Sequence, residues 1–384
     1  MRCDVELPDA APPVLTIDGA AAELIAHGLI TSASIINGDL SITSVARRNY
    51  NLRVERSDGV SYLIKQPTDL TGRFSLSYEA TFYSYCNTEP HAGAIKSFLP
   101  SLVYFDPNTV MLVLELYRDA KNLRDYHQYS DPSGFPTLGI KALGSALGAL
   151  HSTFSTGELA HNESMSWLRR GVPWIMEVHR PTPEVLATLS AANYQTLRIL
   201  QTQAPINSQL DALRTLWTPM TVIHGDIKSD NFLIEHPSDG SLPTTRLVDW
   251  ETVQYGDPAW DIAGVLQDCV ILWINSFPAG LLSVDALVDA ERCSLAAIHP
   301  LLRAFWRSYR QTAESSARGF ATILQRAVRY SAARLIQSAY EMCATANALP
   351  PASVLLLQLS SNILSSPETA QVQVYGLYQD EPEL

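Results

Sequence analysis

A polar stretch of eight residues, HGDIKSDN at positions 224–231, lies between two short apolar runs and constrains this chain more than any other feature. Residues 221–223 precede the stretch and residues 232–234 follow it. Short apolar runs bounded by polar residues are typical of buried strands. The sequence therefore predicts a charged loop at the rim of a buried scaffold, where Asp226 and Asn231 can return to the same place.

The polar side chains of this loop have the chemistry that phosphoryl transfer needs, namely metal ions on the phosphates and a carboxylate that orients the attacking hydroxyl. Asp226 can accept the hydrogen bond of such a hydroxyl. Asn231 can offer its side-chain oxygen to Mg²⁺, a metal that prefers oxygen ligands. Asp249 ends another apolar run and could hold Mg²⁺ on the β- and γ-phosphates of a nucleotide. We therefore expect these three residues to be catalytic, the last two as metal ligands.

A third motif, GDPAWD at 256–261, begins a predicted helix. Pro258 suits the first helical turn, where its missing N–H is not needed, and Asp257 suits the N-cap. Asp261 then lies in the first turn. From there its carboxylate could accept backbone N–H groups of the 224–231 loop.

The first third of the chain alternates apolar and polar residues, as half-buried strands do. Residues 39–65 contain three such runs, and residues 103–105 and 110–116 form a further predicted hairpin. Residues 75–86 have helical spacing, with Ser75 as the expected N-cap.

After about residue 120 helical spacing predominates, so that a strand-rich lobe precedes a helical one, with a ligand cleft expected between them. The predicted segments are an N-terminal extension with a short helix (1–29), a nucleotide-binding N-lobe (30–118), a catalytic and substrate C-lobe (119–365) and a C-terminal tail (366–384). The alternation of QVQVYGL within the tail, at 371–377, would suit a short edge strand or an interaction segment.

Three motifs resemble, in their order and spacing, those of the aminoglycoside phosphotransferase and choline kinase branch of the protein-kinase-like fold. They are HGD-x-x-x-x-N, LVDWE at 247–251 and GDPAWD. The resemblance covers residues 221–264. It implies a bilobal α+β fold with a small antiparallel-sheet N-lobe and a larger, mostly helical C-lobe. It also implies an enzyme that transfers a phosphoryl group from ATP to an alcohol group, with Mg²⁺, and it gives His224 and Asp261 supporting roles.

Lys228 lies two residues after Asp226, where many aminoglycoside kinases have histidine and protein kinases have lysine. We include Lys228 among the catalytic residues, because it could neutralise the transferring phosphoryl group. The alternative is a structural ion pair with a neighbouring acid.

The resemblance also assigns nucleotide-binding roles in the strand-rich part of the chain. Lys65, at the end of YLIK, is similar to the strand lysine that binds the α- and β-phosphates, and Glu79 is similar to its helix partner. Leu63 would share a strand face with Lys65 and cover the adenine. Glu115 and Leu116 resemble the hinge whose backbone bonds the adenine edge.

The phosphate-covering loop departs from the family pattern because it contains no glycine, the residue that lets backbone amides approach phosphate closely. Many small-molecule kinases keep an asparagine near this point. Asn49 or Asn51 would fit, and we expect Asn49 to contact the nucleotide. Arg47 and Arg48 could contact phosphate directly or could be solvated.

The net charge of −12, from 27 Lys and Arg against 39 Asp and Glu, argues against a nucleic-acid partner. The five cysteines form no C-x-x-C pair, which indicates neither a zinc site nor a disulfide framework. The N-terminal residues lack the basic and apolar regions of a signal peptide, and the apolar runs are too short to span a bilayer. We therefore expect a cytoplasmic protein without membrane partners.

Two segments bear on the acceptor. Residues 152–190 contain tryptophans and arginines (Trp167, Arg169, Arg170 and Trp174) and are less acidic than an aminoglycoside or choline site would need. Residues 249–278 resemble the phosphotransferase-like proteins of class V lanthipeptide and thioamitide pathways. This implies a Ser or Thr of a ribosomally synthesised precursor peptide as acceptor, and a partner lyase that eliminates the phosphate. The alternatives are a small-molecule kinase with an aminoglycoside- or choline-like acceptor and a peptide-binding pseudokinase.

Overall fold

The structure is a computed structural model that describes residues 15–45, 49–125, 137–155, 165–235, 243–275 and 295–378. The chain divides into two compact units, one of residues 1–121 with 233–253 and the other of residues 122–232 with 254–384. Arg47 and Arg48 lie outside the described residues, as do the start of the predicted N-terminal extension and the end of the predicted tail. Residues 233–253 belong with the N-terminal part of the chain, although they follow the 224–231 loop in sequence.

The first unit is built on a five-stranded antiparallel sheet of order β1-β2-β3-β5-β4. Its strands are β1 (Leu40–Ser44), β2 (Tyr50–Arg56), β3 (Tyr62–Gln66), β4 (Leu102–Asp106) and β5 (Met111–Glu115). Gly59, in the turn between β2 and β3, has a φ of +96°, which glycine adopts without a steric penalty. The strands predicted within 39–65 and the predicted hairpin after residue 102 are therefore confirmed.

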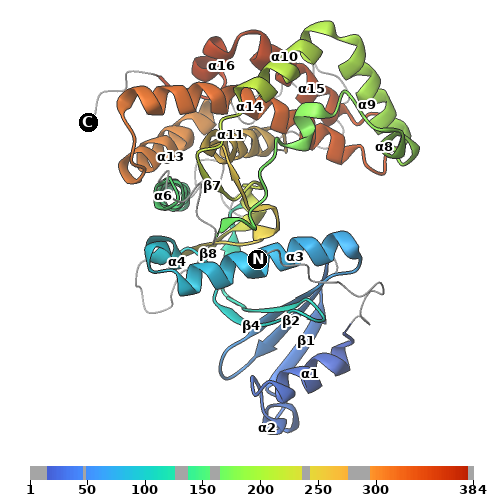
Figure 1. Cartoon of the computed structure of the whole chain (residues 1–384), viewed down its shortest axis with the longest axis vertical. Coiled ribbons are helices and arrows are strands. Elements are labelled where there is room, and N and C mark those ends of the chain that lie inside the picture. The colour runs from blue at the N-terminus through green and yellow to red at the C-terminus, as the bar shows by residue number, and fades with distance from the viewer. Residues whose placement is uncertain are drawn as a thin grey trace. The chain divides into compact units, whose positions relative to one another are not determined.

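Helices cover both faces of this sheet (Figure 1). On one face, α1 (Ile17–Ala26) packs Leu24 into a buried apolar cluster that includes Ile64 of β3. On the other face lies α3 (Leu70–Thr88). Because side chains alternate along a strand, Lys65 of β3 points away from the α1 cluster.

Helix α3 begins earlier than the sequence indicated. Its N-cap is Asp69, whose Oδ1 accepts the N–H of Gly72 at 2.6 Å. Ser75, the expected N-cap, lies buried inside the helix, and its hydroxyl donates to the Gly72 carbonyl at 3.2 Å. The expected start at Ser75 is therefore wrong. A carboxylate at Asp69 satisfies a backbone donor and also complements the helix dipole, which favours the earlier start.

The remaining elements of this part of the chain are short: α2 (Ser32–Ile36), a 3-10 turn (Pro90–Ala92), α4 (Gly93–Lys96), β6 (Lys121–Asn122), β8 (Phe232–Glu235), β9 (Thr244–Leu247) and a second 3-10 turn (Trp250–Thr252). β8 and β9 are neighbouring strands. They carry the chain to Asp249.

The second unit is mostly helical. Its helices are α6 (Thr137–Thr153), α8 (Pro183–Ala187), α9 (Ala191–Thr202), α10 (Ala204–Leu216), α11 (Pro258–Asn275), α13 (His299–Thr312), α14 (Ala317–Met342), α15 (Pro351–Ser365) and α16 (Pro367–Gln373). Two short strands, β7 (Thr221–Ile223) and β10 (Gln254–Gly256), form an antiparallel pair. The described elements also include 3-10 turns at Trp174–Glu177, Ser229–Asn231 and Leu295–Ile298.

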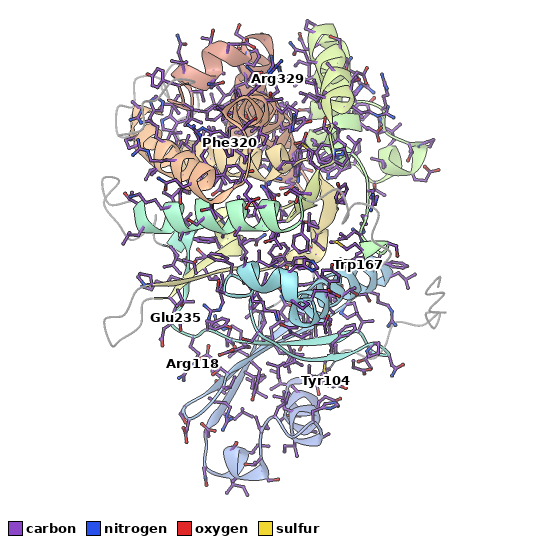
Figure 2. All side chains as sticks on the ribbon, turned by 60° about the vertical axis from the view of Figure 1, so that its left-hand side comes forward. Tyr104, Arg118, Trp167, Glu235, Phe320 and Arg329 are labelled. Carbon is purple, nitrogen blue, oxygen red and sulfur yellow. The ribbon has the colours of Figure 1, made fainter. Side chains whose placement is uncertain are left out.

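Two helix pairs organise the second unit. α6 packs against α13, and a Cβ on Gly144 of α6 would lie 2.5 Å from the carbonyl oxygen of Phe305, so this approach requires glycine. α14 packs against α11 and also against α15 and α16 (Figure 1). Phe320 of α14, labelled in Figure 2, makes T-shaped ring contacts with Trp306 and Tyr309 of α13. This core positions α11 and α14 against the 224–231 loop.

The predicted tail is helical where the structure describes it. α16 covers Pro367–Gln373, and Tyr375 is buried, with its hydroxyl 2.7 Å from that of Ser331 in α14. The expected edge strand at 371–377 is therefore wrong. Pro367 at the helix start and packing on α14 and α15 outweigh a weak local alternation.

An antiparallel sheet in one unit and a mostly helical second unit give an α+β, bilobal, protein-kinase-like fold, as the sequence predicted. Among the helices that the structure describes, none combines the length and the apolar character needed to cross a bilayer.

Candidate active site

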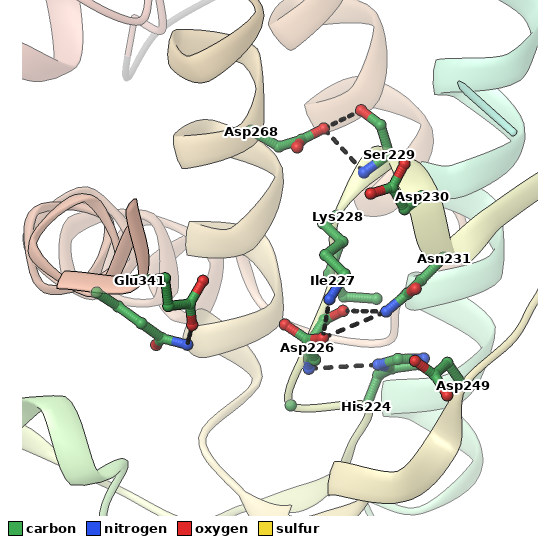
Figure 3. Close-up of polar contacts among 12 residues, drawn as sticks. His224, Asp226, Ile227, Lys228, Ser229, Asp230, Asn231, Asp249, Asp268 and Glu341 are labelled. Atoms are coloured by element: carbon green, nitrogen blue, oxygen red, sulfur yellow. Dashed lines mark hydrogen bonds and ion pairs between the residues drawn. The ribbon is translucent and has the colours of Figure 1, made fainter. Parts of the chain in front are cut away.

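The HGDIKSDN segment forms a loop between β7 and β8, as predicted (Figure 3). β7 pairs with β10, and this pairing anchors the start of the loop. Gly225 has a φ of +86°, which residues with a Cβ rarely adopt. A 3-10 turn at Ser229–Asn231 closes the loop. As a result, Asp226 lies between two tight turns.

Asp226 is surrounded by donors. The Nζ atom of Lys228 lies 2.5 Å from its Oδ2, and Nη2 of Arg334 lies 3.6 Å from its Oδ1. Asn231 Nδ2 donates to the backbone carbonyl of Asp226 at 2.9 Å and lies 3.4 Å from Oδ2 (Figure 3). The structure thus brings Asp226, Lys228 and Asn231 together, and in it Lys228 forms the ion pair that the sequence left as an alternative.

The environment of Asp226 favours its charged form. Burial opposes ionisation, but the nearby charges of Lys228 and Arg334 outweigh this effect and lower the pKa of Asp226. The side chain is still 22% exposed, so a substrate can reach it. At neutral pH, Asp226 is therefore a reachable carboxylate, the form that can bind a hydroxyl and accept its proton.

Asp261 of α11 holds the start of the loop. Its Oδ2 accepts the N–H of His224 at 2.8 Å, and its Oδ1 accepts the N–H of Gly225 at 2.9 Å, as expected from the sequence. His151 Nε2 lies 3.3 Å from Asp261 Oδ2, and Nδ1 of the same ring lies 3.0 Å from the hydroxyl of Tyr309. Burial opposes the charge of Asp261, but the hydrogen bond and charge of His151 help to lower its pKa. A buried carboxylate therefore fixes the loop backbone.

Arg334 of α14 contacts the same loop and was not predicted. It is 4% exposed, and its Nη1 and Nη2 donate to the carbonyls of Gly225 at 3.2 Å and Ile227 at 3.0 Å. The guanidinium also lies 5.1 Å from the ring centroid of Trp260. An arginine inside the apolar run AARLI, at 332–336, is a signal that could have found it, because charged residues are rarely buried without partners.

Asp268 of α11, also missed, holds the other end of the loop. Its carboxylate accepts the N–H of Ser229 at 3.0 Å and also the Ser229 hydroxyl (Figure 3). Burial raises the pKa of Asp268 to about 6, although the Ser229 hydrogen bonds act in the opposite direction. Asp268 follows Asp261 by two helical turns, so both lie on one face of the helix. That spacing was the available signal.

In the first unit, Lys65 joins two carboxylates. Its Nζ lies 2.9 Å from both carboxylate oxygens of Glu79 and 2.9 Å from Oδ1 of Asp249. The Tyr83 hydroxyl donates to Glu79 at 3.0 Å, one helical turn along α3. Burial opposes the charge of Lys65, but the two carboxylates raise its pKa above the ordinary value. The structure therefore gathers three residues that the sequence assigned to phosphate and metal binding.

Asp249 has a strained backbone, with φ 69° and ψ 58° in the left-handed region. Such a conformation costs about 1–3 kcal/mol for a residue other than glycine and often occurs at functional sites. The following residue holds it: Trp250 is buried, stacks on Phe82 at 4.3 Å and donates its indole N–H to the Leu247 carbonyl at 2.9 Å. The Asp249 side chain remains 35% exposed.

The predicted adenine-side residues lie on the same sheet. Leu63 is in β3, two residues before Lys65, so both share one strand face. Glu115 ends β5, and the N–H of Leu116 donates to the Ser61 carbonyl at 2.8 Å. The Leu116 amide is therefore engaged within the protein.

Two asparagines, Asn49 and Asn51, flank the first residue of β2. Asn49 is 6% exposed, and its Oδ1 has no hydrogen-bond partner among the residues that the structure describes. Asn51 stands opposite Lys65 in the β2–β3 register, and its buried Oδ1 also lacks a partner within the same described set. A buried amide oxygen without a partner is costly. Both residues therefore remain candidates to contact a ligand.

The predicted acceptor segment borders the short strand pair of the second unit. Arg169 forms a parallel bridge to Gln254 of β10, and its carbonyl accepts the N–H of Tyr255 at 2.9 Å. The guanidinium of Arg170 lies 4.7 Å from the Tyr255 ring centroid. Trp174 is half exposed and packs edge-on against Tyr340 at 5.4 Å. Trp167, labelled in Figure 2, belongs to the same segment.

The profile of the phosphotransferase enzyme family (APH) matches residues 121–318. This span is more than half of the 384 residues and contains the 224–231 loop, Asp249 and Asp261. The chain belongs to the phosphotransferase enzyme family. No curated protein sequence matches this phosphotransferase.

Several solved structures resemble this phosphotransferase. The complex of APH(2")-IIia with GDP and kanamycin is 14% identical, with a TM-score of 0.48 and coverage of 92% of this chain and 99% of that chain. Choline kinase LicA from Streptococcus pneumoniae is 14% identical, with a TM-score of 0.48 and coverage of 90% and 99%. Macrolide 2'-phosphotransferase MphH from Brachybacterium faecium is 15% identical, with a TM-score of 0.46 and coverage of 86% and 98%. Likenesses this weak do not indicate which acceptor this phosphotransferase uses.

Proposed function

We propose that this phosphotransferase moves the γ-phosphoryl group of ATP to a hydroxyl, and that Asp226 orients this hydroxyl and accepts its proton. The observation that carries the proposal is the state of Asp226. It is a reachable carboxylate whose pKa is lowered, in a loop held at both ends by Asp261 and Asp268. Fixed geometry matters here, because phosphoryl transfer depends on alignment more than on covalent chemistry.

The nucleotide would be held through Lys65 and its neighbours. Lys65 is charged and already fixed by Glu79, so its ammonium is prepared to bind the α- and β-phosphates. Leu63 would cover the adenine from the same strand face. Glu115 and Leu116 would lie at the adenine edge, and Asn49 would contact the phosphates.

Mg²⁺ is proposed as the metal, with Asn231 and Asp249 as its protein ligands. Asn231 directs its Nδ2 to the Asp226 carbonyl, which leaves its Oδ1 as the ligand atom. Asp249 offers a partly exposed carboxylate. Across the described residues, no group of three or more His, Cys, Asp or Glu is gathered for a metal. Mg²⁺ typically takes one or two protein oxygens together with phosphates and waters. When bound, the metal neutralises phosphate charge.

Lys228 would bind the phosphoryl group during its transfer. Its side chain is 38% exposed and stands on a flexible stem beside Asp226. It can leave Asp226 and approach the negative oxygens of the γ-phosphate.

As acceptor we propose a Ser or Thr of a ribosomally synthesised precursor peptide, followed by phosphate elimination by a partner lyase in the cytoplasm. The support is the sequence resemblance of residues 249–278 and the presence of Lys228. The described part of residues 152–190 has exposed Arg169 and Arg170. An aminoglycoside- or choline-like small molecule is the alternative acceptor.

The acceptor class can be tested with purified protein, Mg-ATP and a panel of candidates analysed by intact mass. The panel contains a Ser/Thr-bearing precursor peptide encoded near the gene, the same peptide with Ala and Val in place of Ser and Thr, an aminoglycoside and choline. We expect the mass of one phosphate on the first peptide only. Phosphate on the aminoglycoside or choline would select the small-molecule alternative. Peptide binding that is independent of Mg²⁺ and of Asp226→Asn, without transfer, would indicate a pseudokinase.

A further inference from the structure

We propose that Arg334 is a positioning residue of the phosphotransfer loop, because its buried guanidinium fixes the peptide carbonyls on both sides of Asp226 and stays beside this carboxylate when Lys228 turns to the phosphate. The inference rests on the proposed function, which gives Asp226 and Lys228 their roles. It adds a residue more than one hundred positions away in sequence, on α14.

The contacts of Arg334 bracket Asp226. One terminal nitrogen donates to the carbonyl of Gly225 at 3.2 Å, and the other donates to that of Ile227 at 3.0 Å. The guanidinium is a planar, rigid fork, so two bonds from it restrict the orientation of the bound segment. The peptide units before and after Asp226 are therefore held together, and with them the direction of its side chain.

The Arg334 guanidinium is surrounded by residues of α11 and α14. Its Nε lies 3.4 Å from Oε1 of Gln267, whose Nε2 donates to the Ser338 hydroxyl at 3.0 Å. A Cβ on Gly264 would lie 2.7 Å from the Ile227 carbonyl oxygen and 3.4 Å from Cζ of Arg334. Glycine at this position therefore allows α11, the loop and the guanidinium to meet.

The two cations at Asp226 differ in freedom. The Lys228 side chain is 38% exposed, whereas the Arg334 side chain is 4% exposed and donates to two backbone carbonyls as well as facing the carboxylate. Lys228 can therefore leave while Arg334 cannot. If both charges left, a mostly buried carboxylate would lose its compensation, which is strongly unfavourable. Arg334 thus keeps the Asp226 side chain oriented while Lys228 binds the phosphoryl group.

The test compares Arg334→Lys, which keeps the charge without the fork, and Arg334→Met, which removes both. The matched control is Arg329→Met, on the same helix (Figure 2), since Arg329 pairs at the surface with Glu368. Two quantities are measured: steady-state phosphate release from Mg-ATP with water as acceptor, and amide hydrogen exchange over residues 224–231. Neither requires the natural acceptor.

We expect Arg334→Met to lower kcat by about 10²-fold, as small misplacements of reacting groups do, with an unchanged KM for Mg-ATP. Arg334→Lys should recover part of kcat. Exchange over 224–231 should become about tenfold faster or more in Arg334→Met, because two charge-assisted bonds are lost, while the rest of the second unit keeps its protection. Arg329→Met should match the wild type in both quantities.

A folded Arg334→Met protein with wild-type kcat and wild-type exchange over 224–231 would overturn the proposal, as would a change confined to KM. If Arg334→Met does not fold, Arg334→Lys and Gln267→Leu decide in its place, with smaller losses of kcat and faster exchange expected. If the wild type releases no phosphate to water, the acceptor panel decides the proposed function, and the exchange measurement alone decides whether Arg334 positions the loop.

Discussion

Asp226 and Asp268 belong to the same loop environment, yet their pKa values shift in opposite directions. Burial acts on both, but Lys228 and Arg334 lower the pKa of Asp226, whereas burial dominates at Asp268 and raises its pKa to about 6. The two pKa values therefore move in opposite directions because the cations beside Asp226 outweigh its burial, whereas the neighbours of Asp268 do not. Asp226 is suited to accept a proton, whereas Asp268 is suited to hold Ser229.

The raised pKa of Asp268 predicts a specific pH dependence of stability. Its folded pKa exceeds the ordinary value of 3.8, so its stabilising contribution is complete below that value and is lost as pH rises through about 6. Asp268→Asn keeps an acceptor for the Ser229 N–H but does not titrate. Between pH 4 and pH 7.5, the wild type should lose on the order of 2–3 kcal/mol of unfolding free energy relative to Asp268→Asn.

Urea unfolding of both proteins across this pH range measures the difference. Other groups titrate in both proteins and cancel. A constant difference between the two unfolding free energies would contradict the assignment of this pKa to Asp268.

At the residue scale, sequence reasoning named the residues of the loop motif but missed two residues that hold the loop in place. Asp226, Asn231 and Asp261 stand in a recognisable order, so they could be named without a structure. Arg334 and Asp268 act through helix faces that approach the loop only after folding. Their contacts depend on tertiary packing, which a single sequence does not display.

Among the helices, α3 shows how a short-range signal can mislead. Ser75 is an acceptable N-cap by type, but Asp69 lies six positions earlier and bonds the Gly72 N–H at 2.6 Å. We predict that Asp69→Ala destabilises the protein by about 1 kcal/mol, the usual loss for an N-cap. Ser75→Ala should cost clearly less, because the Ser75 hydroxyl only bonds a carbonyl that is already within the helix.

Chemical denaturation of the two variants compares their unfolding free energies directly. The opposite order, with Ser75→Ala the more destabilised, would place the start of α3 where the sequence first suggested.

Element types were predicted well where the local signal was strong, as with the alternation in β2 and β3 and with Pro258 at the start of α11. The tail was predicted poorly because QVQVYGL alternates over only a few residues. In the structure this segment is tied down by Tyr375, buried against Ser331 of α14. Packing with an element far away in sequence therefore decides its conformation.

At the scale of the whole molecule, the proposed catalytic residues are divided between the two units. Asp226 and Asp249 are close in sequence, but residues 233–253 return to the first unit, where Asp249 bonds Lys65 at 2.9 Å. The sequence order alone suggests one continuous helical lobe after residue 119. The strand pairing of β8 and β9 and the buried Trp250 explain the return. Neither feature has a distinctive composition.

The most direct measurement is ATP turnover by the intact wild-type chain and by Asp226→Asn, followed by ³¹P NMR with Mg²⁺ and the acceptor identified by the panel. We expect the wild type to convert ATP to ADP and phosphorylated acceptor. Asp226→Asn should lose about 10²–10⁴-fold in kcat, because the proton acceptor is removed, and should remain folded and retain nucleotide affinity. Full turnover by a folded Asp226→Asn protein would contradict the role of Asp226 as the residue that prepares the hydroxyl for transfer.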